Sequence, residues 1–145
     1  RLGQALQARW EKAGIKTEIK QFEQHRLIEN ALTHEFQAQA FRWAGRPDPD
    51  LNVYKFFNSK YANIRSSNYT QFSNPEMDKL LDQAAQIPDQ GKRKVLYSEI
   101  SALLAKEMPY DFLFAASFFN ITSKHVHGMI PVPDGLARVR NVWLD

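Results

Sequence analysis

Apolar residues recur along the chain at two different periods and predict alternating helices and strands. Within residues 1–13 they are three and four apart, as in an amphipathic helix packed on a sheet, and Gly14 follows where many helices end. Residues 15–22 alternate apolar and polar side chains and are rich in β-branched residues, as in a strand with one solvated face. A helix over 23–33 and a strand over 36–43 come next, so we expect a parallel, right-handed crossover.

The next part of the chain predicts a short helix and then a long polar connection. Residues 51–57 are predicted to form the helix. Residues 58–72 are rich in Asn, Ser and Tyr without a sustained period, and long ordered connections of this kind tend to be functional. We expect three aromatic side chains to fix this connection to the body of the domain, namely Tyr61, Tyr69 and Phe72.

Two consecutive amphipathic helices follow and are predicted to form a hairpin over the sheet. Ser73 or Asn74 supplies a cap for the first helix, and Pro75 suits its first turn. Pro88 ends this helix and Asp89 caps the next one. The predicted buried faces are Met77, Leu80, Leu81, Ala84 and Ala85 on the first helix and Val95, Leu96, Ile100, Leu103 and Leu104 on the second.

The last part of the chain predicts one buried strand followed by irregular structure. Residues 110–116 are largely apolar and too few for a typical helix, so they are predicted to be a buried strand. Residues 118–145 carry several prolines and glycines and end in an apolar run. We expect irregular structure there, with one or two short strands.

Composition narrows the possible functions. The chain has 145 residues, 43% of them hydrophobic, which suits one domain with a real core. The lack of cysteine excludes disulfides, zinc–thiolate sites and thiol catalysis. The 19 basic residues are dispersed among 16 acidic ones, so nucleic-acid binding is not favoured. No apolar run approaches the ~20 residues of a membrane span. The chain begins with Arg-Leu-Gly inside a predicted helix, so we expect a piece of a longer protein.

The stretch from Phe41 to Asp50 is the best candidate for a site. Gly45 and two prolines restrict the backbone, which predicts a stiff loop at the end of a strand. Ordering such a loop around a ligand costs little entropy, and ligand sites concentrate on loops of this kind. Its functional side chains are Trp43, Arg46, Asp48 and Asp50. An equally open alternative is that Asp-Pro-Asp is only a turn before a helix capped by Asp50 or Asn52.

Few residues suggest catalysis. His125 and His127 are two apart, as metal ligands on one strand can be, but the segment lacks a nearby third ligand. Asp48 and Asp50 resemble an Asp-x-Asp metal motif, which leaves a metal-dependent enzyme as the alternative function. We identify no catalytic residue and expect no metal or other cofactor. An indole, a guanidinium and a carboxylate on one loop instead favour binding of a solute with an apolar part and charged ends.

Five motifs in series resemble the family 5 extracellular solute-binding proteins, the peptide-, nickel- and opine-binding components of ABC importers. They are Ala13-Gly-Ile-Lys-Thr, Trp43-x-Gly with Arg-Pro-Asp-Pro-Asp, Tyr69-x-x-Phe-Ser-Asn-Pro-Glu-x-Asp-x-Leu-Leu, Asp89-x-x-x-Arg-Lys-x-Leu-Tyr and Val126-His-Gly-Met-Ile-Pro-Val-Pro-Asp-Gly. The resemblance implies an α/β fold, the ligand-binding lobe of a type II periplasmic binding protein, with a small mixed sheet flanked by helices. Residues 1–117 would be the C-terminal lobe without its start, and residues 118–145 a return segment toward the other lobe.

The same resemblance implies a periplasmic or otherwise extracytoplasmic protein, with a lipid anchor as one option. The full protein is expected to be a monomer that closes on a small-molecule or peptide solute and delivers it to a membrane permease. It would not bind nucleic acid. The residues expected to contact the solute are Arg42, Trp43, Gly45, Arg46 and Asp48.

One residue departs from the pattern of the dipeptide-binding members. In those proteins an aspartate follows Trp-x-Gly and receives the α-amino group of the ligand, whereas Arg46 occupies that place here, allowing for a short gap. A guanidinium cannot accept a hydrogen bond from an ammonium group. The hypothesis is that Arg46 faces a carboxylate of the solute, or that Asp48 receives the amine instead.

Overall fold

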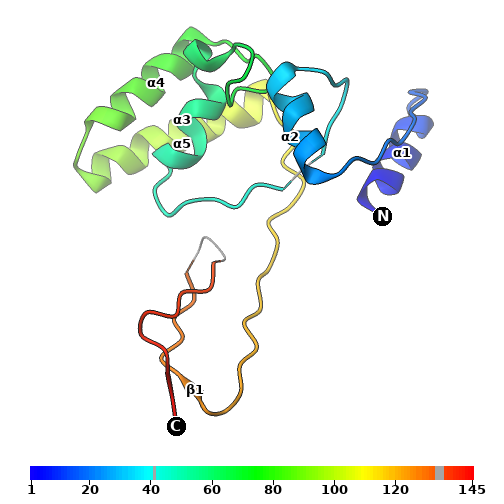
Figure 1. Cartoon of the computed structure of the whole chain (residues 1–145). Helices are drawn as coiled ribbons and strands as arrows, with labels where there is room; N and C mark the ends of the chain where they lie inside the picture. The colour runs from blue at the N-terminus through cyan, green and yellow to red at the C-terminus, as the bar shows by residue number, and fades with distance from the viewer. Residues whose placement is uncertain (41, 133–135) are drawn as a thin grey trace. The chain divides into compact units, whose positions relative to one another are not determined.

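The structure is a computed structural model that describes residues 1–40, 42–132 and 136–145. It divides into two compact units, residues 1–42 and residues 43–145 (Figure 1). The sequence-based expectations that involve Phe41 and the Pro133-Asp-Gly135 end of the tail motif lie outside the described residues. No helix in the described part of the chain has both the length and the apolar character that crossing a bilayer requires.

The first unit contains α1 (Leu2–Lys12) and α2 (Gln24–Thr33), both predicted from their helical spacing. The chain leaves α1 through Gly14, which takes a φ of +82°, a conformation that side chains disfavour. Gln7 Nε2 then donates a 2.8 Å hydrogen bond to the carbonyl of Thr17. This bond holds the extended segment after α1 against the helix. No residue of α1 is buried, so the predicted packing of this helix on a sheet is wrong for the described chain.

The second unit is built on α3 (Asp50–Phe57), α4 (Pro75–Gln86) and α5 (Gln90–Glu107), with the 3-10 helix η1 (Ser59–Tyr61) after α3. Helices α4 and α5 form the predicted hairpin, and α3 packs against α4 (Figure 1). Val95, which the sequence assigned to the buried face of α5, is exposed, and so is Ala85 on α4. The buried apolar core consists of Phe56, Phe57, Met77, Leu81, Ala84, Ile100, Leu103 and Leu104.

Side-chain caps set the starts of α4 and α5 as predicted. Asn74 Oδ1 accepts hydrogen bonds of 2.9 Å and 3.1 Å from the backbone N–H groups of Glu76 and Met77, and Pro75 opens the helix. Asp89 Oδ1 accepts a 2.8 Å bond from the N–H of Lys92. Each bond satisfies a backbone donor that has no partner within its helix, so the turn between α4 and α5 is fixed locally.

The polar connection 58–72 is ordered around Asn68, whose side chain is fully buried. Asn68 Nδ2 donates to the carbonyls of Asn58 and Phe72 at 3.3 Å and 2.8 Å, and its Oδ1 accepts a 3.0 Å bond from the N–H of Phe72. The predicted aromatic anchors are confirmed, since Tyr61, Tyr69 and Phe72 form ring contacts with α3.

The sheet in the described residues consists of β1 (Val126–His127) and β2 (Trp143–Leu144). They pair antiparallel, with Val126 opposite Leu144 and His127 opposite Trp143. These are the short strands expected in the last part of the chain. The pairing brings Asp145 back to His125, because the N–H of Asp145 donates a 3.2 Å bond to the carbonyl of His125.

Three predicted strands are wrong. Residues 15–22, the described part of 36–43 and residues 110–116 form no strand, so the parallel crossover between the first two is wrong as well. Residues 110–116 are also not buried as predicted, because Phe112 and Phe114 are 65% and 73% exposed. The sequence pattern reports local backbone preference, whereas a strand also needs a neighbour that pairs with its N–H and C=O groups. The described residues offer these segments no such neighbour.

We predict that Asn68→Ala lowers the free energy of unfolding by about 2 kcal/mol, because it removes the partner of the Phe72 N–H and carbonyl and one of two donors to the Asn58 carbonyl, which keeps its bond from the Tyr61 N–H. Urea unfolding followed by circular dichroism measures the change. Asn63→Ala is the control, since Asn63 is exposed and its amide donates a 3.0 Å bond to the carbonyl of Lys60. Equal midpoints for the two variants would show that Asn68 does not organise the connection.

Candidate functional site

The candidate loop, residues 43–50, begins with an indole that is partly open to solvent. The Trp43 ring meets the ring of Phe56 edge to face at 4.7 Å between centroids, yet 53% of Trp43 is exposed. Phe56 belongs to α3 and to the buried core. The indole therefore packs partly on the core while about half of Trp43 remains accessible to a solute.

The amide of Asn52, in the first turn of α3, fixes the middle of this loop. Its Oδ1 accepts a 2.6 Å hydrogen bond from the N–H of Arg46. Its Nδ2 donates to the carbonyl of Arg46 at 2.6 Å and to the carbonyl of Asp48 at 3.1 Å. A Cβ on Gly45 would lie 3.3 Å from Asn52 Oδ1, so a glycine suits this close approach. The backbone of Arg46 is thus restrained while its side chain is exposed.

Asp48 pairs with Arg93 of α5, although 45% of its side chain is exposed. Arg93 Nη2 lies 2.8 Å from Asp48 Oδ1 and Nη1 lies 3.2 Å from Oδ2, a two-pronged contact between guanidinium and carboxylate. Asp48 Oδ1 also accepts a 2.9 Å bond from the N–H of Asp50. The hydrogen bond from Arg93 is the main reason that the pKa of Asp48 lies below its usual value, with the Asp50 N–H adding to it.

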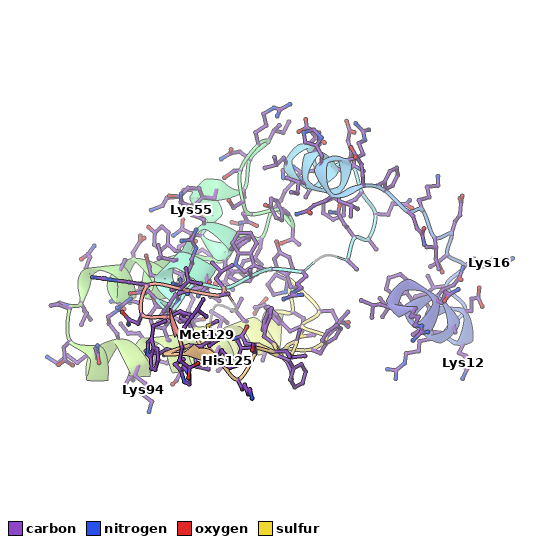
Figure 2. The ribbon with its side chains drawn as sticks, turned by 60° about the horizontal axis from the view of Figure 1, so that its bottom comes forward. Lys12, Lys16, Lys55, Lys94, His125 and Met129 are labelled. Atoms are coloured by element: carbon purple, nitrogen blue, oxygen red, sulfur yellow. The ribbon has the colours of Figure 1, made fainter. Side chains whose placement is uncertain are left out.

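Tyr97, one turn after Arg93 on α5, completes the support of the loop. Its hydroxyl donates to Asp50 Oδ1 at 3.4 Å and accepts from Arg93 Nη2 at 3.4 Å. Partial burial is the main reason that the pKa of Tyr97 is raised. Lys94, the next residue along α5, points away from the helix (Figure 2). The Arg93 guanidinium therefore binds the loop, whereas the adjacent cation, Lys94, points away from the helix.

The structure places four of the five predicted site residues on this one loop of the second unit. Trp43 and Arg46 present exposed side chains, Gly45 passes beside Asn52, and Asp48 turns to Arg93. The fifth, Arg42, is exposed and is the last residue of the first unit.

Asp-Pro-Asp is also a turn before a helix, as the alternative interpretation held, but the predicted caps are wrong. Helix α3 begins at Asp50 with Pro49 in the cap position, and no side chain caps it. The carboxylate of Asp48 holds the turn instead, by accepting the N–H of Asp50.

Sequence reasoning missed the three residues that hold the loop, Asn52, Arg93 and Tyr97. Asn52 was considered only as a helix cap, although an asparagine just after a glycine- and proline-rich loop is also a common partner for loop backbone. Arg93 and Tyr97 stand in the Asp-x-x-x-Arg-Lys-x-Leu-Tyr motif. Their spacing of four places both on one side of α5, but it does not reveal that this side faces residue 48.

Two open hollows lie near the α4–α5 turn. One, of about 390 Å³, is lined by Asp48, Asp50 and Arg93 together with residues 85–88. The other, of about 510 Å³, is lined by residues that include Gln83 and Val95. Trp43 and Arg46 line neither of these two hollows.

The histidine pair has a partner that the sequence did not reveal. Asp145 Oδ1 lies 3.2 Å from both His125 Nδ1 and His127 Nε2, and the His127 ring stacks on Trp143 at 4.2 Å between centroids. The β1–β2 pairing brings these groups together from opposite ends of the segment. Across residues 1–40, 42–132 and 136–145, no group of three His, Asp or Glu side chains is arranged to hold a metal ion.

Comparisons with known proteins relate the chain to periplasmic binding proteins. It is 30% identical over 128 residues to a dipeptide-binding protein of Pseudomonas aeruginosa, covering 88% of this chain and 24% of the relative. It is 26% identical to the dipeptide-binding protein of Escherichia coli, covering 100% of this chain and 27% of the relative. The chain therefore spans about a quarter of the length of these relatives. No protein-family model matches it.

Two solved structures have the same fold. HbpA2 from Haemophilus parasuis superposes with a TM-score of 0.73 at 25% identity, covering 99% of this chain and 28% of the other. The periplasmic binding protein DppA from Helicobacter pylori, in complex with the peptide STSA, gives a TM-score of 0.68 at 26% identity, covering 76% of this chain and 22% of the other. The expected fold class, a lobe of a periplasmic binding protein, is confirmed, although the sheet in the described residues has two strands.

We predict that Arg93→Gln raises the pKa of Asp48 toward its usual value, whereas Lys94→Gln leaves it unchanged. Because the folded-state pKa of Asp48 is depressed, the ion pair stabilises the folded chain above about pH 4 and this contribution disappears as the pH falls through the lowered pKa. An NMR titration of the Asp48 carboxyl carbon measures the shift. Identical titration curves in wild type and Arg93→Gln would contradict the ion pair.

Proposed function

This chain is a relative of the family 5 extracellular solute-binding proteins, and from this premise we propose that it forms one wall of a cleft that holds a small peptide or amino-acid-derived solute. The full protein would be the solute-binding component of an ABC importer and would perform no chemistry. One observation carries the proposal, namely that the exposed side chains of Trp43 and Arg46 sit on a loop that Asn52 holds through its backbone and Arg93 holds through the Asp48 side chain. A restrained loop loses little entropy when a solute binds.

We propose that Arg46, and not Asp48, supplies the charge that faces the solute. Asp48 already accepts two hydrogen bonds from Arg93 and one from the Asp50 N–H, so most of its acceptor capacity is used inside the unit. The Arg46 side chain is exposed. Of the two possibilities raised by the sequence, the geometry favours a solute carboxylate opposite Arg46 over a solute amine opposite Asp48.

The alternative function, a metal-dependent enzyme built on Asp48 and Asp50, has less support. The guanidinium of Arg93 is already paired with Asp48, so a metal cation would have to compete with it. The relatives are named as peptide- or heme-binding proteins. Binding without catalysis therefore accounts better for the same residues.

We further propose that residues 1–117 are most of the C-terminal lobe and that residues 118–145 return toward the other lobe. The coverage of about a quarter of the relatives' length supports a longer protein. The location is proposed to be periplasmic or extracytoplasmic, the transport partner a membrane permease, and the full protein a monomer. The opposing wall of the cleft, and with it half of the solute contacts, would come from the remainder of that protein.

We predict that the full-length protein carrying this sequence binds dipeptides with a free carboxylate about ten- to hundredfold more tightly than their C-terminal amides, because a charged hydrogen bond to Arg46 is lost in the amides. Arg46→Asp is expected to abolish or reverse this preference. Isothermal titration calorimetry with dialanine and dialanine amide measures both affinities.

Arg65→Asp is the control for this charge reversal, because Arg65 is exposed on the connection 58–72 and lies outside the candidate loop. It should keep the preference of the wild type. An unchanged preference in Arg46→Asp would contradict the role of Arg46, and failure of the wild-type protein to bind any dipeptide would contradict the solute class. Haem belongs in the panel, because one relative is a heme-binding protein of Haemophilus influenzae.

We predict that the backbone amides of residues 111–122 exchange slowly in the full-length protein and rapidly in the isolated chain. These residues are all exposed and form no strand here, although they include Phe114, Phe119 and Ile121. Such an apolar segment is expected to find pairing and burial in the remainder of the protein. Hydrogen exchange with mass spectrometry compares the two, and residues 58–72 should be equally protected in both. Rapid exchange of 111–122 in the full-length protein would contradict the proposal.

A further inference from the structure

We propose that Arg93 determines the charge specificity of the solute site, because it sequesters the carboxylate of Asp48 and leaves Arg46 as the charge that the loop presents. This inference rests on the proposed function and adds a residue to it that lies 45 positions away from the loop on α5. Arg93 would act through Asp48 without touching the solute, and it is therefore a positioning residue.

The first argument is the geometry of the contact. Both terminal nitrogens of Arg93 reach Asp48, at 2.8 Å and 3.2 Å, and each carboxylate oxygen receives one of them. The Arg93 side chain is only 22% exposed, and its guanidinium carbon lies 5.5 Å from the centre of the Tyr97 ring. A guanidinium held on two sides in this way is preorganised, so the pair does not depend on a freely moving surface cation.

The second argument is the balance of charge on the loop. Residues 43–50 carry one cation, Arg46, and two carboxylates, Asp48 and Asp50, so the loop alone would be net negative. Arg93 cancels the charge of Asp48, and the Tyr97 hydroxyl donates to Asp50. Both carboxylates thus have partners on α5, although 45% of the Asp48 side chain is exposed and Asp50 keeps its charge, whereas Arg46 is an exposed cation. Removal of Arg93 would free a carboxylate close to the proposed solute.

A simpler role for Arg93, as a strut that only keeps the loop in place, makes a different prediction. Loss of a strut weakens the binding of every solute alike, because it disturbs the loop whatever the charge of the solute. Loss of a charge-sequestering group changes the ratio of affinities for solutes that differ in one charge. The ratio therefore separates the two roles.

The test uses calorimetry on the full-length protein with dialanine, N-acetyl-dialanine and dialanine amide. In Arg93→Gln we expect the preference for a free amine, measured as the affinity ratio of dialanine to N-acetyl-dialanine, to rise about tenfold over the wild type. The preference for a free carboxylate, measured against the amide, should fall. Arg93→Lys should retain most of the wild-type ratios, and Lys94→Gln, which removes the adjacent outward-pointing cation, should retain both fully.

A double variant isolates the route through Asp48. In an Asp48→Asn background there is no carboxylate to release, so adding Arg93→Gln should leave the amine ratio unchanged. Equal weakening of all three solutes in Arg93→Gln, or the same change of ratio in the Asp48→Asn background, would overturn the inference while leaving the proposed function intact. If the wild-type protein binds none of the three solutes, the proposed function itself fails and the inference falls with it.

Should Arg93→Gln fail to fold, as judged by circular dichroism, the charge-swapped protein with Asp48→Arg and Arg93→Asp replaces it. This variant rebuilds the pair with its charges exchanged and keeps Asn52 in place to hold the loop backbone. In this variant residues 48 and 93 again pair with each other and Arg46 is again left outside the pair. We therefore expect the affinity ratios of the wild type. A shift toward the free amine would overturn the inference.

Discussion

The apolar contact between α3 and the α4–α5 hairpin is the constraint on which the candidate site depends. Phe56 and Phe57 bury against Met77 and Leu81, and α3 begins directly after the loop. Holding α3 therefore fixes where the loop ends. Burial of a large apolar side chain contributes about 1.5–3 kcal/mol, whereas a charge pair at the surface is weak and screened by salt. The core sets the geometry, and the polar contacts select among the loop conformations that the core allows.

Two polar side chains, those of Asn52 and Arg93, restrain the loop in different ways. Asn52 binds backbone groups on both sides of Arg46, so it determines the path of the chain whatever side chain stands there. Arg93 binds the side chain of Asp48, so it determines which charged group of the loop is held in an ion pair. The Trp43 ring packs against Phe56, and this contact involves neither Asn52 nor Arg93. The position of the indole, the path of the loop backbone and the pairing of the Asp48 charge therefore depend on different residues, so each can be changed by a separate substitution.

Helices, their caps and the α4–α5 hairpin were predictable from the sequence, whereas strand pairing and the contact between the loop and α5 were not. The caps at Asn74 and Asp89 could be predicted, because a cap involves residues only two or three positions apart. The strands at 15–22 and 110–116 were wrong, because strand pairing depends on a distant neighbour that the pattern does not contain. Of the candidate site, a restrained loop at residues 43–50 could be predicted, because glycine and proline restrict the backbone locally. The support of the loop by Arg93 could not be predicted, because the spacing of residues along a helix does not show which part of the fold that side of the helix contacts.

The position of Trp43 gives the protein an optical consequence. An indole that is packed against a phenyl ring and about half exposed to water emits fluorescence that depends on how many water molecules reach it. Any solute or protein surface that covers the exposed part of the ring would move the emission to shorter wavelength, whatever its chemical identity. Within these 145 residues, replacement of Trp10 and Trp143 by phenylalanine leaves Trp43 as the indole that reports the occupancy of this surface in real time, before the occupant has been identified.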